Sequence, residues 1–93
     1  MLIYIINIHN LLTIQIKSID QKVDIAYTCQ KNDIFAIIEE KLYKEYPQYK
    51  DLHTYFTVNA HLVESSKTMT DNKIRNNDII LLNAYQSSIY SLK

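Results

Sequence analysis

Residues 68–82 read TMTDNKIRNNDIILL, a polar stretch that ends in four consecutive apolar residues. An apolar run of strand length without alternation is typical of a strand that is buried on both faces or lies in the centre of a sheet. We therefore predict that residues 78–82 form a central strand, between a first hairpin and a third strand. We predict that residues 64–77 form a long loop, because the chain must cross the sheet to reach that central position.

Two segments near the N-terminus predict the first hairpin. Apolar and polar residues alternate through residues 11–17, and residues 23–28 repeat the alternation, as half-buried strands do. A short polar link with a turn at Asp20–Gln21 joins them. The chain contains no glycine, so we expect Asn and Asp to adopt the backbone angles that tight turns require.

One helix is predicted after the hairpin. Asn32 or Asp33 can cap its N-terminus, and apolar residues recur at helical spacing through residues 34–42. Pro47 disfavours helical geometry in the preceding residue, which places the end of the helix near Tyr46.

Two short strands are predicted between the helix and the long loop. Residues 55–58 (YFTV) and 61–63 (HLV) are mainly apolar or aromatic, and they lie on either side of a turn at Asn59–Ala60. The order is then strand, strand, helix, strand, short strand, loop and central strand. One helix packed across one sheet makes a two-layer α+β domain.

Composition limits the function classes. A chain of 93 residues suits one domain, and its net charge of zero does not favour nucleic acid or acidic lipid. Cys29 is the single cysteine, which excludes a disulfide within the chain and favours a reducing, intracellular location. Residues 1–10 are too short to span a bilayer and lack the features of a secretory signal. We expect a cytoplasmic or organellar protein, mitochondria included, that is not secreted and has no transmembrane segment.

The predicted element order resembles the β-grasp fold, and the residues resemble ubiquitin over roughly residues 11–84. The resemblance implies a mixed four- to five-stranded sheet with one helix packed across it. It also implies that Asp71 caps a turn, while Met69 and Ile74 fill the core. The segments that carry it are LTIQIKSI at 12–19, NDIFAIIEEKL at 32–42, TMTDNKI at 68–74, which resembles the family's Thr-Leu-Ser-Asp-x-x-Ile, and DIILL at 78–82.

The C-terminal segment departs from the conjugated members of this family. Ubiquitin ends in Gly-Gly soon after its last strand, whereas this chain continues NAYQSSIYSLK and has no glycine. The resemblance therefore implies a non-conjugated ubiquitin-like protein, and the same absence argues against the sulfur-carrier branch. The ferredoxin branch needs four cluster cysteines. No cofactor is expected.

Ubiquitin receptors bind an apolar patch on the family's sheet, and this chain carries candidate equivalents. The resemblance places that patch at Ile19, Phe56 and Asn83, of which two are apolar, with His61 nearby. The alternative is that Phe56 packs inward and Ile19 is a single exposed apolar residue.

Further apolar and tyrosine residues are candidates for partner contacts. Residues 1–10 form an apolar extension and residues 85–93 an apolar tail around the domain at 11–84, and tyrosine is enriched in interfaces. Alternatively, both ends fold back onto the domain and the tyrosines seal the helix end against the sheet. The candidate residues are Leu2, Tyr4, Ile6, Tyr43, Tyr46, Tyr49, Tyr85, Ile89, Tyr90 and Leu92.

No catalytic or metal-binding pattern is found in the sequence. Cys29 precedes the helix, but no spacing brings His9, His53 or His61 to it as a base, and the histidines lack metal-ligand spacing. We expect a protein without enzymatic activity that contacts other protein subunits, as a small accessory or structural subunit of a multiprotein complex. The alternatives are a transient adaptor that uses a ubiquitin-like receptor face, and a processed modifier or carrier.

Overall fold

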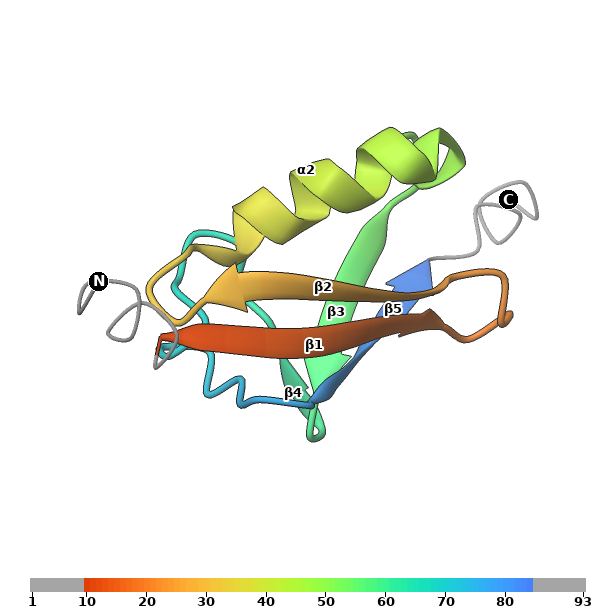
Figure 1. Cartoon of the computed structure of the whole chain (residues 1–93). Helices are drawn as coiled ribbons and strands as arrows, with labels where there is room; N and C mark the ends of the chain where they lie inside the picture. Colours follow the sequence, from red (N-terminus) through yellow and green to blue (C-terminus); the bar gives the residue numbers. More distant parts are fainter. Residues whose placement is uncertain (1–9, 85–93) are drawn as a thin grey trace.

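The computed structural model describes residues 10–84 of the chain. Within this range the sequence forms five strands, one α-helix and one 3₁₀ turn (Figure 1). Their bounds are β1 (Leu11–Ser18), β2 (Asp24–Gln30), α2 (Phe35–Glu45), η1 (Pro47–Tyr49), β3 (Thr54–Val58), β4 (His61–Leu62) and β5 (Ile79–Ala84).

The described strands form one sheet in the order β2-β1-β5-β3-β4, and α2 packs across one of its faces (Figure 1). β5 runs parallel to β1 and antiparallel to β3, so the predicted central strand is confirmed. The result is a small α+β domain with a mixed five-stranded sheet, compatible with a β-grasp fold.

Of the two alternatives for the apolar run of β5, the central position is the observed one, and only one face of the strand is buried. Ile80 and Leu82 are 0% and 2% exposed, whereas Ile79 and Leu81 are 46% and 42% exposed. The strand is central because it pairs on both edges, while the sheet face opposite α2 is open within residues 10–84. Leucine and isoleucine therefore cover both faces of β5, but only one face forms the core.

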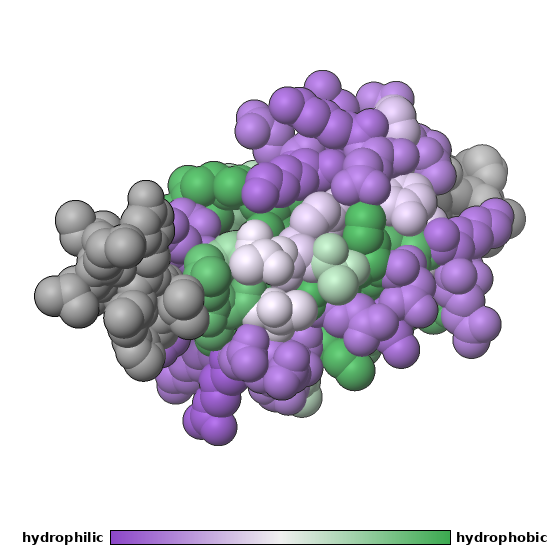
Figure 2. Space-filling model, in the orientation of Figure 1, coloured by the Kyte–Doolittle hydropathy of each residue, from purple (hydrophilic) through white to green (hydrophobic). Residues whose placement is uncertain are grey.

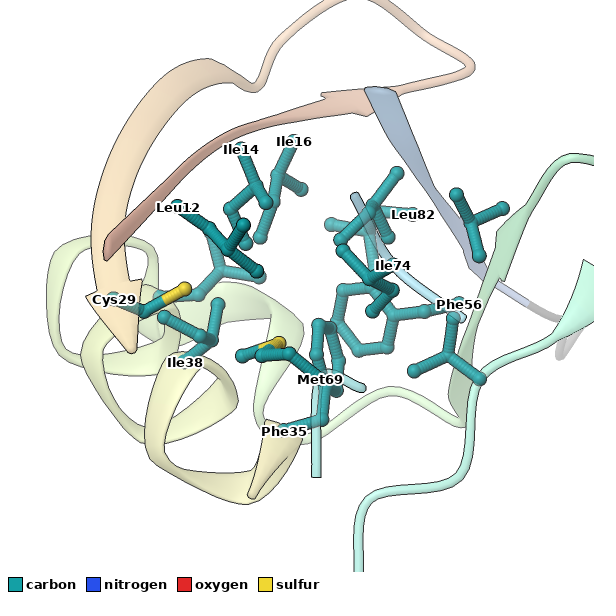
Figure 3. Close-up of a cluster of buried hydrophobic side chains, with 14 of the residues drawn as sticks. Leu12, Ile14, Ile16, Cys29, Phe35, Ile38, Phe56, Met69, Ile74 and Leu82 are labelled. Atoms are coloured by element: carbon teal, nitrogen blue, oxygen red, sulfur yellow. The ribbon is translucent and has the colours of Figure 1, made fainter. Parts of the chain in front are cut away.

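The core lies between α2 and the sheet. Figure 3 shows apolar side chains from β1, β2, α2, β3, β5 and the loop before β5 pointing toward one another. The Phe35 and Phe56 rings meet edge to face, with centroids 5.0 Å apart. Met69 and Ile74 are 0% and 4% exposed, so the expectation that they fill the core is confirmed.

The start of α2 corrects the predicted cap. Ile34 occupies the N-cap position and no side chain caps the helix. Instead, the backbone N–H groups of Phe35 and Ala36 donate to carbonyls of the loop before β5, Lys67 at 3.0 Å and Ser65 at 2.9 Å. Loop carbonyls supply the acceptors that free helix N–H groups require, so no capping side chain is needed. The helix ends at Glu45, as Pro47 predicted.

The loop before β5 is organised by Asn72 and not by Asp71. The Asn72 side chain is buried, and its Nδ2 donates to the carbonyls of Glu64, Lys67 and Thr68 at 2.9, 3.2 and 3.1 Å. Its Oδ1 accepts from the Glu64 N–H at 2.8 Å. The Asp71 side chain is exposed, and the Thr68 hydroxyl accepts from the Asp71 N–H instead. The predicted capping role of Asp71 is therefore wrong.

In this glycine-free chain, several turn residues adopt positive φ, and some of them are residue types that tolerate it poorly. Within residues 10–84, positive φ values occur at Gln21, Asn59, Ala60, Lys73 and Asn77, from 48° to 70°. Asparagine occupies two of these positions, as expected, but Gln, Ala and Lys occupy the others. The β3–β4 turn needs positive φ at both of its central residues, which forces Ala60 into a conformation where its Cβ crowds the backbone.

Replacing Ala60 by glycine is expected to stabilise the domain. Relief of the crowded left-handed conformation is worth about 1–2 kcal/mol, and the added freedom of the unfolded chain offsets about 0.4–1 kcal/mol of it. Urea denaturation should show a higher midpoint. Ala36→Gly in the first turn of α2 is the control and should lower stability by up to about 1 kcal/mol, the value for a helix interior. A loss of stability in Ala60→Gly would contradict the strain account.

Candidate interaction surface

The open face of the sheet carries a group of exposed apolar side chains around the middle of β5. The register places Leu81 of β5 beside Lys17 of β1 and Thr57 of β3, and Thr57 beside Leu62 of β4. Ile79 lies two residues along β5 on the same face. We call Thr57, Leu62, Ile79 and Leu81 the open-face patch.

Three of the four side chains in the open-face patch are apolar and accessible. Leu62 is 59% exposed, and Ile79 and Leu81 are each above 40%. Single exposed apolar residues are common, but a contiguous group is typical of a contact site. Lys17 and Gln15, which are half-buried, border the patch on β1. An apolar centre with a polar border is the usual composition of a protein-binding surface.

A hollow of about 320 Å³ lies where β1 and β5 end, and Ile19, Tyr49, Tyr55 and Asn83 are among the residues that line it. Ile19 is 70% exposed, so its predicted accessibility agrees with the structure. Asn83 is 9% exposed, and its Nδ2 donates to the carbonyl of Tyr55 at 3.5 Å.

Asp20 holds the β1–β2 turn beside this hollow. Its carboxylate accepts hydrogen bonds from the Ser18 hydroxyl at 2.5 Å, the Lys22 N–H at 3.1 Å and the Tyr49 hydroxyl at 3.2 Å. The hydrogen bond from Ser18, followed by that from the Lys22 backbone, lowers the pKa of Asp20. These contacts orient the turn, and with it the adjacent Ile19.

Phe56 does not belong to any accessible surface of the described fold, which corrects its place among the predicted contact residues. It is 3% exposed, and its ring lies in the core against Phe35. Side chains alternate between the faces of a strand, so Thr57 and not Phe56 projects from β3 onto the open face. The inward-packing alternative for Phe56 is therefore the observed one.

The tyrosines around the end of α2 pack mainly against their own domain. Tyr49 is 5% exposed, and its ring lies 6.5 Å from that of Tyr46. Tyr43 is half-buried, and its hydroxyl is 2.6 Å from the Thr54 hydroxyl. Burial raises the pKa of both Tyr43 and Tyr49. The structure thus agrees with the alternative that these tyrosines seal the helix end, and Tyr49 is inaccessible as a contact residue.

The remaining predicted contact residues lie outside the described range. These are Leu2, Tyr4, Ile6, Tyr85, Ile89, Tyr90 and Leu92.

Cys29 lies in a poor environment for a nucleophile. Its side chain is 5% exposed, and burial, followed by the charge of Asp33, raises the pKa of its thiol. A reactive cysteine needs a lowered pKa.

His61 is half-buried, and its Nε2 lies 2.9 Å from the carbonyl oxygen of Asn72.

The described residues 10–84 contain neither a cluster of metal-binding side chains nor a membrane-spanning helix. No three His, Cys, Asp or Glu side chains in this range gather closely enough to hold a metal ion. No helix in the same range is both long and apolar enough to cross a bilayer.

The sequence patterns alone do not identify Leu62, Ile79 or Leu81 as contact candidates. For Ile79 and Leu81 the reason is that the run IILL at residues 79–82 shows no alternation of apolar and polar residues. The signal that could have identified Ile79 and Leu81 is the two-residue period of a strand, applied to β5 once one of its faces is assigned to the core. Leu62 follows from its position opposite Thr57.

Comparison with known proteins found no matching family model and no matching curated protein sequence.

Proposed function

We propose that this chain is a non-catalytic, ubiquitin-like interaction protein that serves as a small accessory subunit of a larger protein assembly. The observation that carries the proposal is the open-face patch, with its accessible Leu62, Ile79 and Leu81. The ubiquitin-like assignment is supported by the TMTDNKI motif at residues 68–74 and by the order of strands and helix.

Burial of the open-face patch can contribute favourable free energy to the binding of a partner. Fully burying a Leu or Ile side chain contributes about 1.5–3 kcal/mol, and these three side chains are about half accessible, so each has roughly half of that to contribute. The sheet beneath them is rigid because β5 pairs on both edges. Little backbone ordering is then needed when a partner binds, which limits that part of the cost of association.

The proposal that the protein is non-catalytic rests on the environment of Cys29. Its buried thiol has a raised pKa, and a nucleophile would require both a lowered pKa and a positioned base. The open-face patch, by contrast, offers apolar contact and no group suited to proton transfer.

Leu81→Glu is expected to release the protein from its assembly without unfolding it. Leu81 is the centre of the open-face patch, and a carboxylate there would have to lose its hydration to enter an apolar interface. The wild-type chain, expressed in its own cells and fractionated by size after gentle lysis, should elute in a particle much larger than its own 11.0 kDa. The variant should elute near 11.0 kDa.

Leu52→Glu is the matched control. Leu52 is 41% exposed, nearly as much as Leu81, but lies in the connector between η1 and β3. This variant should stay with the large particle. If the wild-type chain itself elutes near 11.0 kDa, the subunit proposal fails. The transient-adaptor alternative, supported by the exposed Ile19 beside its hollow, would then take its place.

A further inference from the structure

The two edges of the sheet differ in how they are protected. The edge strand β4 has two residues, whereas β2 has seven and pairs with β1 at every one of them. Natural edge strands are protected by shortness, proline, bulges or charge, but β2 reads DIAYTCQ, with one charge at its first residue. Figure 2 shows neutral and apolar residues along the middle of this side, between hydrophilic side chains above and below.

The hydrogen bonds at both ends of the β1–β2 hairpin show which backbone groups of β2 point outward. The Lys31 N–H donates to the Asn10 carbonyl at 2.8 Å, and the Ser18 N–H donates to the Val23 carbonyl at 3.0 Å. Hydrogen-bonded and non-hydrogen-bonded pairs alternate along an antiparallel ladder. The odd-numbered residues of β2 therefore bond β1, and the N–H and C=O groups of its even-numbered residues point away from the sheet.

One of the four even-numbered residues already has local partners. The Gln30 N–H donates to the Asp33 carboxylate at 2.9 Å, and the Gln30 carbonyl accepts from the Asp33 N–H at 3.0 Å. Asp24, Ala26 and Thr28 are exposed, and their outward N–H and C=O groups have no hydrogen-bond partner within residues 10–84. These three residues are arranged symmetrically about Ala26.

We propose that two copies of this chain pair through β2, antiparallel, about a two-fold axis at Ala26. Ala26 then lies opposite Ala26 of the second copy, and Asp24 lies opposite Thr28. Each hydrogen-bonded pair exchanges two hydrogen bonds, so the three pairs make roughly six, and every free group of this edge gains a partner. Such an interface is self-complementary, as two-fold symmetry requires.

The side chains of β2 suit this register on both faces of the joined sheet. On the open face, the methyl groups of Ala26 allow close approach, and Asp24 meets a hydroxyl group of Thr28. On the face toward α2, Ile25 lies opposite Tyr27, and both side chains are partly buried against the core of their own copy. Like charges opposite each other would destabilise the pair, and this register places none opposite each other.

The dimer should be weak, because the contact is short. An interface of this kind falls below the size of stable protein complexes, and association must first overcome the loss of translational and rotational freedom. We expect a Kd on the order of 0.1 mM. The inference does not depend on the open-face patch, and it is tested on purified chain in the absence of other proteins.

The first experiment measures the mass of the purified full chain from roughly 10 µM to roughly 1 mM by sedimentation equilibrium. The mass should rise from 11.0 kDa toward twice that value. Ala26→Pro should raise the Kd at least about tenfold, because proline removes the central outward N–H. The β1–β2 ladder does not use this N–H, so circular dichroism should show an intact fold. Ala26→Ser keeps the N–H and a small side chain, and should dimerise as the wild type does.

The second experiment tests the register by oxidative cross-linking. Ala26→Cys alone should form a covalent dimer, whereas Asp24→Cys alone and Thr28→Cys alone should not. A mixture of Asp24→Cys chains and Thr28→Cys chains should cross-link, because these residues lie opposite each other. The wild-type chain, with its buried Cys29, sets the background.

Three outcomes would overturn the proposal. The first is a mass of 11.0 kDa at the highest concentration, and the second is equal cross-linking of all three single-cysteine variants. The third is a monomer in which the Ala26 N–H is protected from hydrogen exchange, because residues 1–9 of the same chain or another segment would then occupy the edge in place of a second copy.

Discussion

Phe56→Ala is expected to lower the free energy of unfolding by about 3–5 kcal/mol. The ring is 3% exposed, meets Phe35 edge to face, and lies among core side chains from both layers of the domain (Figure 3). Its removal exposes no new polar group, so the loss consists of transfer free energy plus the cavity that remains. Small domains bury limited apolar surface, and a loss of this size is a large part of their total stability.

Urea denaturation followed by circular dichroism measures this loss. Phe56→Leu keeps most of the volume and should lose much less than Phe56→Ala. Thr57→Ala, one residue along on the open face, should change stability by less than about 1 kcal/mol. If Phe56→Ala left stability unchanged but weakened association, Phe56 would have to be an interface residue and not a core residue.

Asn72→Ala is expected to lower the free energy of unfolding by about 2–4 kcal/mol. The side chain is buried and forms hydrogen bonds with backbone groups of Glu64, Lys67 and Thr68. Removing it leaves the Glu64 N–H without a partner, at a cost of about 1–3 kcal/mol. The three carbonyls each lose one hydrogen bond but keep a backbone donor, from the N–H groups of Lys67, Phe35 and residue 72. The same loop supplies the carbonyls that accept from the first N–H groups of α2, so the start of the helix should loosen with it.

Asp71→Ala is the neighbouring control. Its side chain is exposed, and surface substitutions of this kind usually change stability by less than about 0.5 kcal/mol. Hydrogen exchange should localise the effect of Asn72→Ala, with faster exchange at the Phe35 and Ala36 N–H groups than in the wild type. If Asp71→Ala proved the more destabilising of the two, the motif at residues 68–74 would be organised by its acidic residue, as the resemblance to ubiquitin implied.

The candidate surface was only partly predictable. Ile19 follows a predicted strand and lies in a predicted turn, and it is exposed as expected. Phe56 was assigned to the contact surface by resemblance, and that assignment was off by one residue along β3. In a strand, a shift of one residue moves a side chain to the opposite face, so the error exchanged a core residue for an open-face residue, Thr57.

The sequence by itself determined the order of the elements and the central position of β5. Periodicity in the chain encodes these features directly, through alternation in the strands, helical spacing in α2 and the apolar run at residues 79–82. Each signal arises within one short segment, so no knowledge of distant residues is needed to interpret it.

Only the tertiary structure decided which side of each strand became the core and how the free backbone groups found partners. Asn72 ties residues 64–68 together, and carbonyls of that loop accept from the first N–H groups of α2, which lie about 30 residues earlier in the chain. The open-face patch likewise joins β3, β4 and β5. Hydrogen bonds and burial depend on groups that come into contact only after the chain has folded. Local sequence patterns therefore do not predict which distant groups will be partners.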